Sequence, residues 1–404
     1  MKKEFLLCFL TLIFFIPAIR AQDTITEITI KRIYTSKHPQ DPEYPQFVIF
    51  SKSNNFQMGF GGYIRLTGAF DFNGIVDSYD FITYDIPVEN RNLSEKRICF
   101  DAHQSRIYTE ILGNITGDPI RFYLEADFYS DHYYPRIRHA YGQYKGFLIG
   151  QTWTTMMDLD ATPNTVDFEG PNSSVALRTP MIRYTLSISN AFKMMTSLEL
   201  PEVSMTYNNA LASSYQYVPD VILVFRFQAK RGHLQAGGVF RTMAYADRIR
   251  NDQKTIFGGG AAISGLFKLT KKDNFMFQGV IGKGMAKYIQ DISGVGLDAA
   301  PGYDKYNGRN MIPIRAGGLY FGYQHYWCTK LNSTLVYGFT KVHSKNTNLL
   351  NQDYRLGQYA SINLFWNILP SMRVAMEYLW GQRKNNGGEN GNANRFNGMV
   401  QFNF

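Results

Sequence analysis

The chain of 404 residues carries a formal net charge of +9 at pH 7, has 15% aromatic side chains and contains only three cysteines. Its basic residues are scattered singly rather than clustered in runs, which argues against a nucleic-acid partner and suits the lining of an aqueous lumen better. The few cysteines exclude a disulfide framework, so an exported chain of this size needs another source of stability. A closed β-barrel, in which every backbone group is paired, is one such source.

Residues 1–21 predict a secretory signal peptide. Lys2 and Lys3 form a basic start, an apolar stretch follows them, and a small residue, Ala21, ends the segment. A membrane anchor is the alternative, but the apolar stretch is short and its small-residue end favours cleavage. Beyond residue 21 no apolar run reaches about 18 residues, so no transmembrane helix is expected in the mature chain.

Residues 22–57 mix polar and β-prone positions and contain Pro39, Pro42 and Pro45 without a sustained heptad. We expect a short N-terminal periplasmic segment there rather than a coiled coil. The main domain is therefore predicted to occupy residues 58–404.

From residue 58 onward, segments of alternating polarity follow one another with the two-residue period of β-strands. In one example, Ile120, Phe122 and Leu124 share a face while Arg121 and Glu125 share the other. Sixteen such segments predict an all-β domain: 58–71, 102–113, 119–129, 136–144, 146–151, 178–189, 191–199, 219–230, 232–245, 255–269, 274–287, 312–328, 330–343, 354–368, 371–385 and 394–404.

Three further features favour a transmembrane antiparallel β-barrel over a soluble sandwich. The connections alternate between tight turns and long loops, as periplasmic turns and extracellular loops do in outer-membrane barrels, and sixteen is an even number of strands. Apolar ladders such as the one from Val221 to Phe227 carry no charge on their face. Trp327, Trp366 and Trp380 lie near strand ends, as in aromatic girdles.

The chain ends on a strand whose apolar face includes Phe396, Val400, Phe402 and Phe404. A closing strand that ends in phenylalanine is typical of bacterial outer-membrane barrels, in which the barrel-assembly machinery recognises it. We therefore predict a location in the bacterial outer membrane, with outer-membrane lipid and that machinery as partners.

The connection 152–177 is the third long one and carries Asp158, Asp160, Asp167 and Glu169. In general porins the third external loop folds inward and narrows the pore, so we expect this segment to form a constriction. An exposed acidic loop is the alternative.

Nine arginines lie on predicted polar strand faces: Arg65, Arg106, Arg121, Arg136, Arg138, Arg183, Arg226, Arg315 and Arg373. A confined ring of guanidinium groups favours anions, because these groups stay charged and match carboxylates in geometry. The competing role is structural pairing with acidic residues on the same faces, namely Glu110, Glu125, Asp127 and Glu377. Which arginines are paired stays open at this point.

Seven motifs follow in order: Phe60–Phe72 (FGGYIRLTGAFDF), Gln104–Glu110 (QSRIYTE), Leu124–Phe128 (LEADF), Arg138–Gly142 (RHAYG), Gly150–Asp158 (GQTWTTMMD), Asp167–Pro171 (DFEGP) and Pro180–Tyr184 (PMIRY). This series resembles the DcaP-like outer-membrane porins, densely over residues 60–185 and only in architecture beyond them. The resemblance implies a homotrimeric sixteen-stranded porin that passes small organic anions such as dicarboxylates. Some members have a long N-terminal coiled coil, which this chain does not show.

His139 shares a predicted face with Ile137 and Tyr141, which should point outward. Because a polar ring facing lipid is unfavourable, we expect a buried subunit contact there; a satisfied histidine near an interface is the alternative. The histidines and the two remaining cysteines show no metal-ligand spacing, so neither a metal nor a cofactor is expected.

The predicted function is passive diffusion of small hydrophilic solutes, with a preference for organic anions, and not catalysis. Two other classes stay open. A lipid-active barrel hydrolase would need a catalytic triad, and the dipeptide His343-Ser344 has no recognisable acid partner. A non-conducting structural barrel is the other alternative.

Overall fold

The computed structural model describes residues 47–51, 55–75, 79–88, 96–115, 117–130, 133–302, 310–343, 347 and 349–404. The predicted signal peptide lies outside the described residues, as does most of the predicted periplasmic segment. In the described ranges no helix is long and apolar enough to cross a membrane. The helical turns found there are short 3-10 helices: η1 (Thr83–Asp85), η3 (Leu159–Ala161), η4 (Ala286–Tyr288) and η5 (Gln290–Ile292).

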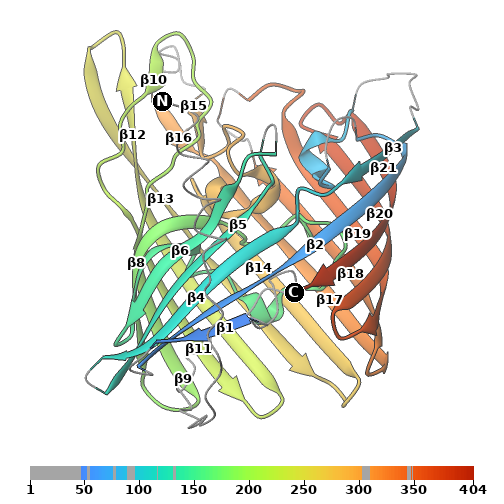
Figure 1. The fold of residues 1–404 in the computed structure, drawn as a ribbon. Coiled ribbons are helices and arrows are strands. Elements are labelled where there is room, and N and C mark those ends of the chain that lie inside the picture. The colour runs from blue at the N-terminus through green and yellow to red at the C-terminus, as the bar shows by residue number, and fades with distance from the viewer. Residues whose placement is uncertain are drawn as a thin grey trace, which may run out of the picture. The chain divides into compact units, whose positions relative to one another are not determined.

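Among the described residues, sixteen antiparallel strands close into a barrel (Figure 1). Its strands are β2 (Phe56–Asn73), β4 (Arg106–Ile115), β5 (Asp118–Asp127), β6 (Arg136–Tyr144), β7 (Phe147–Trp153), β8 (Arg178–Ser187), β9 (Phe192–Glu199), β11 (Asp220–Ala229), β12 (Gly232–Asp247), β13 (Asp252–Lys268), β14 (Asp273–Lys283), β17 (Arg315–Cys328), β18 (Leu331–His343), β19 (Tyr354–Leu369), β20 (Met372–Asn385) and β21 (Asn390–Asn403). The first strand, β2, pairs with the last, β21, and this pairing closes the sheet.

Five shorter strands accompany the barrel strands: β1 (Phe47–Phe50), β3 (Arg97–Asp101), β10 (Leu211–Ser213), β15 (Ala299–Pro301) and β16 (Met311–Pro313). The strand β3 continues the position of β4, because both pair with the same edge of β2. On the other edge of β2, β21 ends opposite Tyr63 and β1 pairs with the stretch 57–60 beyond it. Six described residues of the predicted periplasmic segment 22–57 thus belong to the sheet: the four of β1, which cover the edge of β2 beyond β21, and the first two of β2 itself.

The sixteen predicted strands are confirmed, with small shifts at their ends. Two connections predicted to be long, 246–254 and 386–393, are four-residue turns, because β12 and β13 continue into the first and β21 continues into the second. Several of the added pairs, such as Asp247 with Asp252 and Lys384 with Asn390, join two polar residues. Their sequence therefore lacks the alternation that marks a strand.

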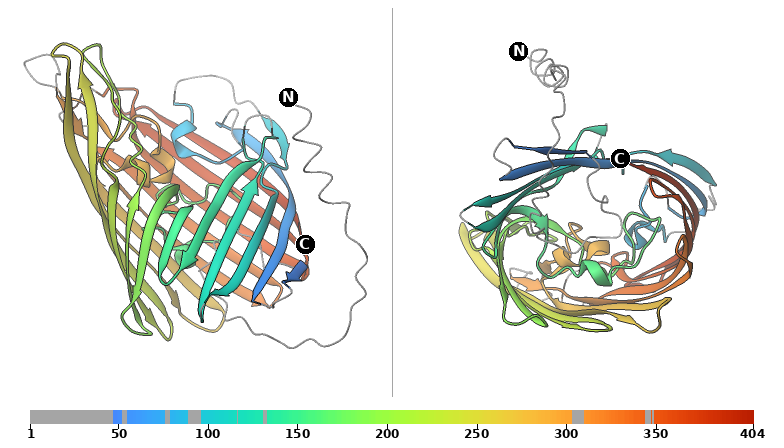
Figure 2. Two further views of the ribbon diagram at one scale, coloured as in Figure 1. Left: turned by 60° about the vertical axis from the view of Figure 1, so that its left-hand side comes forward. Right: turned by 60° about the horizontal axis from the view of Figure 1, so that its bottom comes forward.

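The two faces of the sheet differ sharply in chemistry. In β2, the side chains of Ile64 and Leu66 are 62% and 49% exposed, whereas that of Arg65 between them is 2% exposed. The same alternation of exposed apolar and enclosed polar residues runs around the barrel. Figure 2 draws the ring that its strands form. Phe396, Phe402 and Phe404 of the last segment lie on the exposed apolar face, as predicted. This arrangement suits a barrel whose outside meets lipid and whose inside meets water.

The predicted outward position of His139 is wrong. In β6 the pairing with β5 slips by one residue at Arg138, so that His139 pairs with the enclosed Glu125. This β-bulge reverses the face of the residues that follow it. The His139 ring is buried, and its Nδ1 lies 3.0 Å from Oγ1 of Thr152. His139 is therefore not a subunit contact.

An apolar cluster joins two connections to the barrel wall. Met156 and Val175, from the connection 154–177, pack with residues 285–297 against Ile222 of β11 and Val280 of β14. All of these side chains are buried. The connection 154–177 and the stretch 285–297 are thus ordered by contacts with the strands and not by their own hydrogen bonds alone.

Candidate functional site

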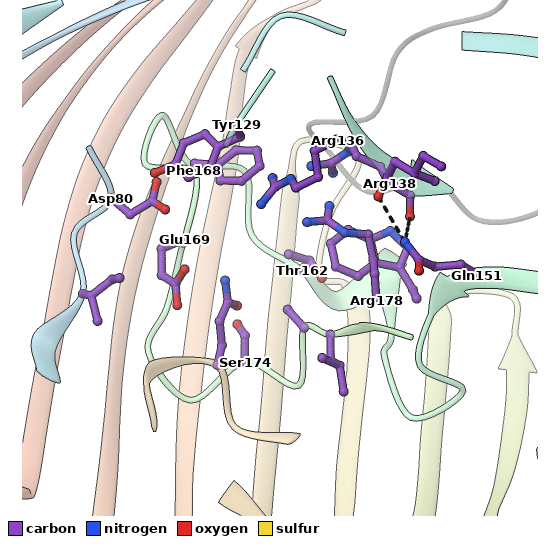
Figure 3. Close-up of a pocket in the computed structure, with 16 residues that line it drawn as sticks. Asp80, Tyr129, Arg136, Arg138, Gln151, Thr162, Phe168, Glu169, Ser174 and Arg178 are labelled. Carbon is purple, nitrogen blue, oxygen red and sulfur yellow. Dashed lines mark hydrogen bonds between the residues drawn. The ribbon is translucent and has the colours of Figure 1, made fainter. Parts of the chain in front are cut away.

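A cavity of about 530 Å³ lies between the segment 154–177, the segment 79–88 and the ends of β6, β7 and β8 (Figure 3). Its lining carries opposite charges on two sides. Arg136, Arg138 and Arg178 form what we call the basic side. Asp80 and Glu169 form the acidic side, and both are drawn away from the arginines in Figure 3. A small solute in this cavity would therefore cross an electric field.

Two of the three arginines on the basic side are paired with carboxylates. Arg136 donates to both oxygens of Asp127 at 2.9 and 2.8 Å. Arg138 bridges two acids, donating from Nε to Glu125 at 2.7 Å and from Nη1 to Asp127 at 2.8 Å. These bonds hold the guanidinium planes in fixed positions, because paired charge-assisted hydrogen bonds restrict orientation.

Arg178 differs from these two. Its Nη1 atom is buried and has no hydrogen-bond partner among the described residues. Arg178 is the first residue of β8, and its guanidinium carbon lies 4.7 Å from the centre of the Trp153 ring. Arg178 therefore adds a positive charge to the cavity that no nearby carboxylate in the described ranges cancels by an ion pair.

Arg178 reaches the cavity because the barrel wall opens at this point. The pairing of β6 with β7 ends at Ala140 and Gln151. Beyond that pair the strands separate, and Trp153 and Arg178, which pair with each other across β7 and β8, line the cavity. By alternation Arg178 would share the outer face with Ile182, so the strand pattern alone does not predict its position.

On the acidic side, burial shifts the titration of both carboxyl groups. Burial and then the negative charge of Asp167 raise the pKa of Asp80 to about 7. Burial, followed by the charges of Asp80 and Asp167, raises the pKa of Glu169 well above its usual range. Near neutral pH the acidic side thus carries less negative charge than its two carboxyl groups would carry in water.

The segment 154–177 is tied to the barrel through Asp158. This carboxylate lies 2.7 Å from Nε2 of His233 and 2.7 Å from Oγ of Ser264, and it accepts a bond of 3.2 Å from Arg226. Arg226 also pairs with Asp160. The oxygen and nitrogen atoms of Asp158, Asp160 and His233 are close enough to share one metal ion. The guanidinium of Arg226 already supplies a positive charge to both carboxylates, so this group is accounted for as an ion-pair network.

A second set of contacts holds the other half of the segment. Nη2 of Arg65 donates to the backbone oxygen of Val166. The Asp167 carboxylate accepts a bond of 3.1 Å from the backbone N–H of Phe81, and the Asp167 N–H donates to Glu377. The segment 154–177 therefore contacts β2 and β20, which lie on either side of β21 where the barrel closes.

The remaining predicted arginines lie in different environments. Arg106 lies 3.6 Å from Glu125 and Arg121 donates to Glu110 at 2.7 Å, so the structural pairing left open by the sequence is observed for both. Arg183 is half-buried on the enclosed face of β8 and makes no ion pair with another described residue. None of these guanidinium groups lies among the cavity-lining residues.

Two further arginines lie away from this cavity. Arg373 lines a separate cavity of about 410 Å³ near the tight turns and donates to Asn367 at 2.8 Å. Arg315, predicted on a polar inner face, is exposed on the apolar outer face at the start of β17. The lumen assignment of Arg315 is wrong, because it followed the charge of the side chain and not its position in the alternation with Phe321.

Sequence reasoning missed Arg178, Trp153, Asp80 and Tyr129 as lining residues. Trp153 stands inside the motif Gly150–Asp158, which offered a signal for it. Asp80 comes from a connection with no regular pattern, and only its approach to segment 154–177 in the folded chain brings it to the cavity.

The closed barrel, its apolar outer face and its charged cavities together define an outer-membrane channel of the porin class. Residues 50–404 match the sequence profile of a family described as DcaP outer membrane protein. The chain belongs to this family, as its motifs predicted.

Solved structures share the fold at low sequence identity. The outer membrane channel DcaP of Acinetobacter baumannii is 19% identical, with a TM-score of 0.76, over 88% of this chain and 99% of that one. OmpT, an outer membrane protein of Vibrio cholerae, is 12% identical, with a TM-score of 0.56, over 88% and 99% of the two chains. OmpF of Salmonella typhi, in complex with daunomycin, is 9% identical, with a TM-score of 0.57, over 89% and 100%. No curated protein matches by sequence.

Proposed function

We propose that the protein is a passive pore for small hydrophilic solutes that prefers organic anions such as dicarboxylates. The observation that carries this proposal is the basic side of the cavity: Arg136, Arg138 and Arg178 stand together, and Arg178 has no carboxylate partner in the described ranges. Guanidinium groups stay charged at all relevant pH values and bind carboxylates with two parallel bonds.

The charge on the opposite side supports the same preference. Because burial raises the pKa values of Asp80 and Glu169, this side repels anions less than two ionised carboxylates would. Arg136 and Arg138 line the cavity with guanidinium groups that their ion pairs hold in place, so a carboxylate solute meets positive groups in fixed positions.

We infer that the segment 154–177 is folded into the lumen and sets its width. Its support is the number of strands it contacts: β2 through Arg65, β12 through His233 and β20 through Glu377. Contacts with strands spread so widely around the ring are those expected of a segment inside it, and Figure 2 draws coil within the ring.

Solute uptake into proteoliposomes tests the preference. We expect succinate to enter faster than an uncharged solute of equal size at low salt, with the difference reduced at high salt because screening weakens the attraction. Arg178→Gln should lower succinate entry several-fold, because it removes one charge whose attraction to a carboxylate is on the order of 1 kcal/mol once water and ions screen it. Equal entry of both solutes in the wild type would contradict the proposal.

Arg183→Gln is the matched control. Arg183 lies on the same strand and makes no ion pair with another described residue, but it does not line the cavity. We expect its removal to leave succinate entry nearly unchanged. Equal losses in both variants would indicate a general effect of net charge and not a binding contact.

We also propose that residues 1–21 are a cleaved signal peptide, that the C-terminal segment ending in Phe404 is recognised by the barrel-assembly machinery, and that the protein forms a homotrimer. One solved structure of OmpT from Vibrio cholerae is described as a trimer form. With His139 excluded from the outer face, the exposed apolar side chains of the first five barrel strands, β2, β4, β5, β6 and β7, are the candidates for the subunit contact; Phe122 and Leu124 are examples.

A further inference from the structure

The outer face of the barrel carries an unusual row of basic side chains at the ends of three neighbouring strands. Lys283 ends β14, Arg315 begins β17 and His343 ends β18. The register places Lys283 directly opposite Arg315, and Arg315 directly opposite His343. All three side chains are exposed. β14, β17 and β18 run side by side in Figure 1.

Two more cations extend this row, which we call the basic row. Lys341 lies two residues before His343 on the same exposed face, and Arg355 stands at the start of β19. The charged groups that act on His343 are Lys341, Arg315 and Arg355, and all three are basic. In the described part of the chain, no hydrogen bond or ion pair joins these side chains to another residue.

Such a row is unfavourable by itself. Like charges directly opposite one another on adjacent strands repel. A charge on the lipid-facing side of a barrel is also costly, and the cost falls only where the strand nears the head-group region. The basic row lies at that level, because its strands end there and continue into the connections 284–314 and 344–353. An external anion would relieve the repulsion.

An apolar groove begins next to the basic row. It has a volume of about 410 Å³ and is lined by Phe257 and Ile281 as well as by Lys283 and Arg315. Phe257 and Ile281 are each 64% exposed. The floor is open because Gly259 stands opposite Lys283, where a side chain would otherwise project. The groove thus offers apolar walls at one end and two cations at the other.

We propose that this face binds a phosphorylated, acylated lipid of the outer leaflet, with an acyl chain in the groove and a phosphate against Lys283 and Arg315. The charge of the basic row matches a phosphate, and the apolar walls match hydrocarbon. The position of the basic row along the barrel axis also fits an outer-leaflet head group. The long connections of outer-membrane barrels are extracellular, and outer-leaflet head groups lie beside them. The inference does not depend on which solutes the pore passes.

Binding of lipid A to the purified, detergent-solubilised protein tests this proposal. Native mass spectrometry would count retained molecules of lipid A carrying two phosphates, beside the same lipid with its phosphates removed. The double variant Lys283→Gln/Arg315→Gln should weaken binding of the phosphorylated form by roughly ten- to thirty-fold, since each cation near an anionic lipid surface contributes on the order of 1 kcal/mol. The dephosphorylated lipid should bind weakly to both proteins.

The matched control is Lys230→Gln/Lys268→Gln, which removes two exposed cations from the tight-turn end of the barrel. It should bind lipid A like the wild type. A second variant, Phe257→Ala, removes an apolar wall without changing charge and should also weaken lipid A binding. Heat-dependent migration of each variant in gels confirms that the barrel is folded.

Three results would overturn the proposal. The first is equal binding of lipid A by the wild type and by the Lys283/Arg315 double variant. The second is equal binding of the phosphorylated and dephosphorylated lipids. The third is lipid-free association of barrels that the double variant abolishes, which would make this face a contact between copies of the chain.

Discussion

Asp158 accepts a hydrogen bond from Nε2 of His233 across 2.7 Å, and this bond joins the segment 154–177 to strand β12. Burial alone would raise the pKa of the Asp158 carboxyl, but the bonds to His233 and the charge of Arg226 lower it below its usual value. The carboxylate therefore stays ionised, and its charge-assisted bonds to His233, Arg226 and Ser264 hold one end of the segment in place.

Asp158→Asn should loosen this end of the segment. Removing one partner of a buried charge network costs about 3–5 kcal/mol, because the other charges lose their compensation. We expect larger and noisier single-channel currents from a barrel that is still folded. Asp160→Asn is the control: Asp160 is half-buried and pairs with Arg226, so its removal should have a smaller effect. Identical currents in the wild type and in Asp158→Asn would show that the apolar cluster around Met156 holds the segment without this network.

Deleting residues 156–172 tests whether the segment narrows the pore. The deletion removes the contacts of Asp158, Val166 and Asp167 but leaves every barrel strand intact. We expect higher conductance, weaker selectivity and unchanged heat-dependent migration in gels. Unchanged conductance would mean that the segment does not limit the pore.

Anion preference should fall as the pH rises through about 7. Asp80, whose pKa is raised to about 7, is neutral below that pH and negative above it. Its ionisation adds negative charge opposite the arginines, so the permeability ratio of chloride to potassium should drop by about twofold between pH 6 and pH 8. In Asp80→Asn the drop in the chloride-to-potassium permeability ratio should disappear, and the value found at pH 6 should persist to pH 8. A step of the same size in the variant would assign it to another group.

The extracted protein should migrate as an oligomer in cold detergent sample buffer and as a monomer after heating. In the described part of the chain, each of the sixteen barrel strands pairs with a neighbour along both of its edges, so the fold itself resists detergent. Replacement of the exposed Phe122 and Leu124 by serine should favour the monomer. Light scattering that finds a monomer after mild extraction of the wild type would contradict the trimer.

The strands were predictable because alternation survives wherever one face meets lipid and the other does not. Ile64 and Leu66 against Arg65 is such a case. The position of His139 was not predictable, since a one-residue bulge at Arg138 leaves no mark in composition yet reverses the face. The outer position of Arg315 follows from its parity with Phe321 in β17, although its charge suggested the lumen.

The cavity was only partly predictable for a different reason. Arg136 and Arg138 were found because they stand on a polar strand face. Arg178 reaches the cavity only because β6 and β7 separate beyond Ala140, which depends on strand lengths and not on local pattern. Asp80 arrives from a connection whose course is set by tertiary contacts.

The reversal potential of single channels in a potassium chloride gradient tests the central claim most directly. Purified protein in a planar bilayer should conduct with a reversal potential biased toward the chloride equilibrium, and the bias should shrink in Arg178→Gln but not in Arg183→Gln. A protein that is folded yet does not conduct, or a bias toward potassium, would contradict an anion-preferring pore.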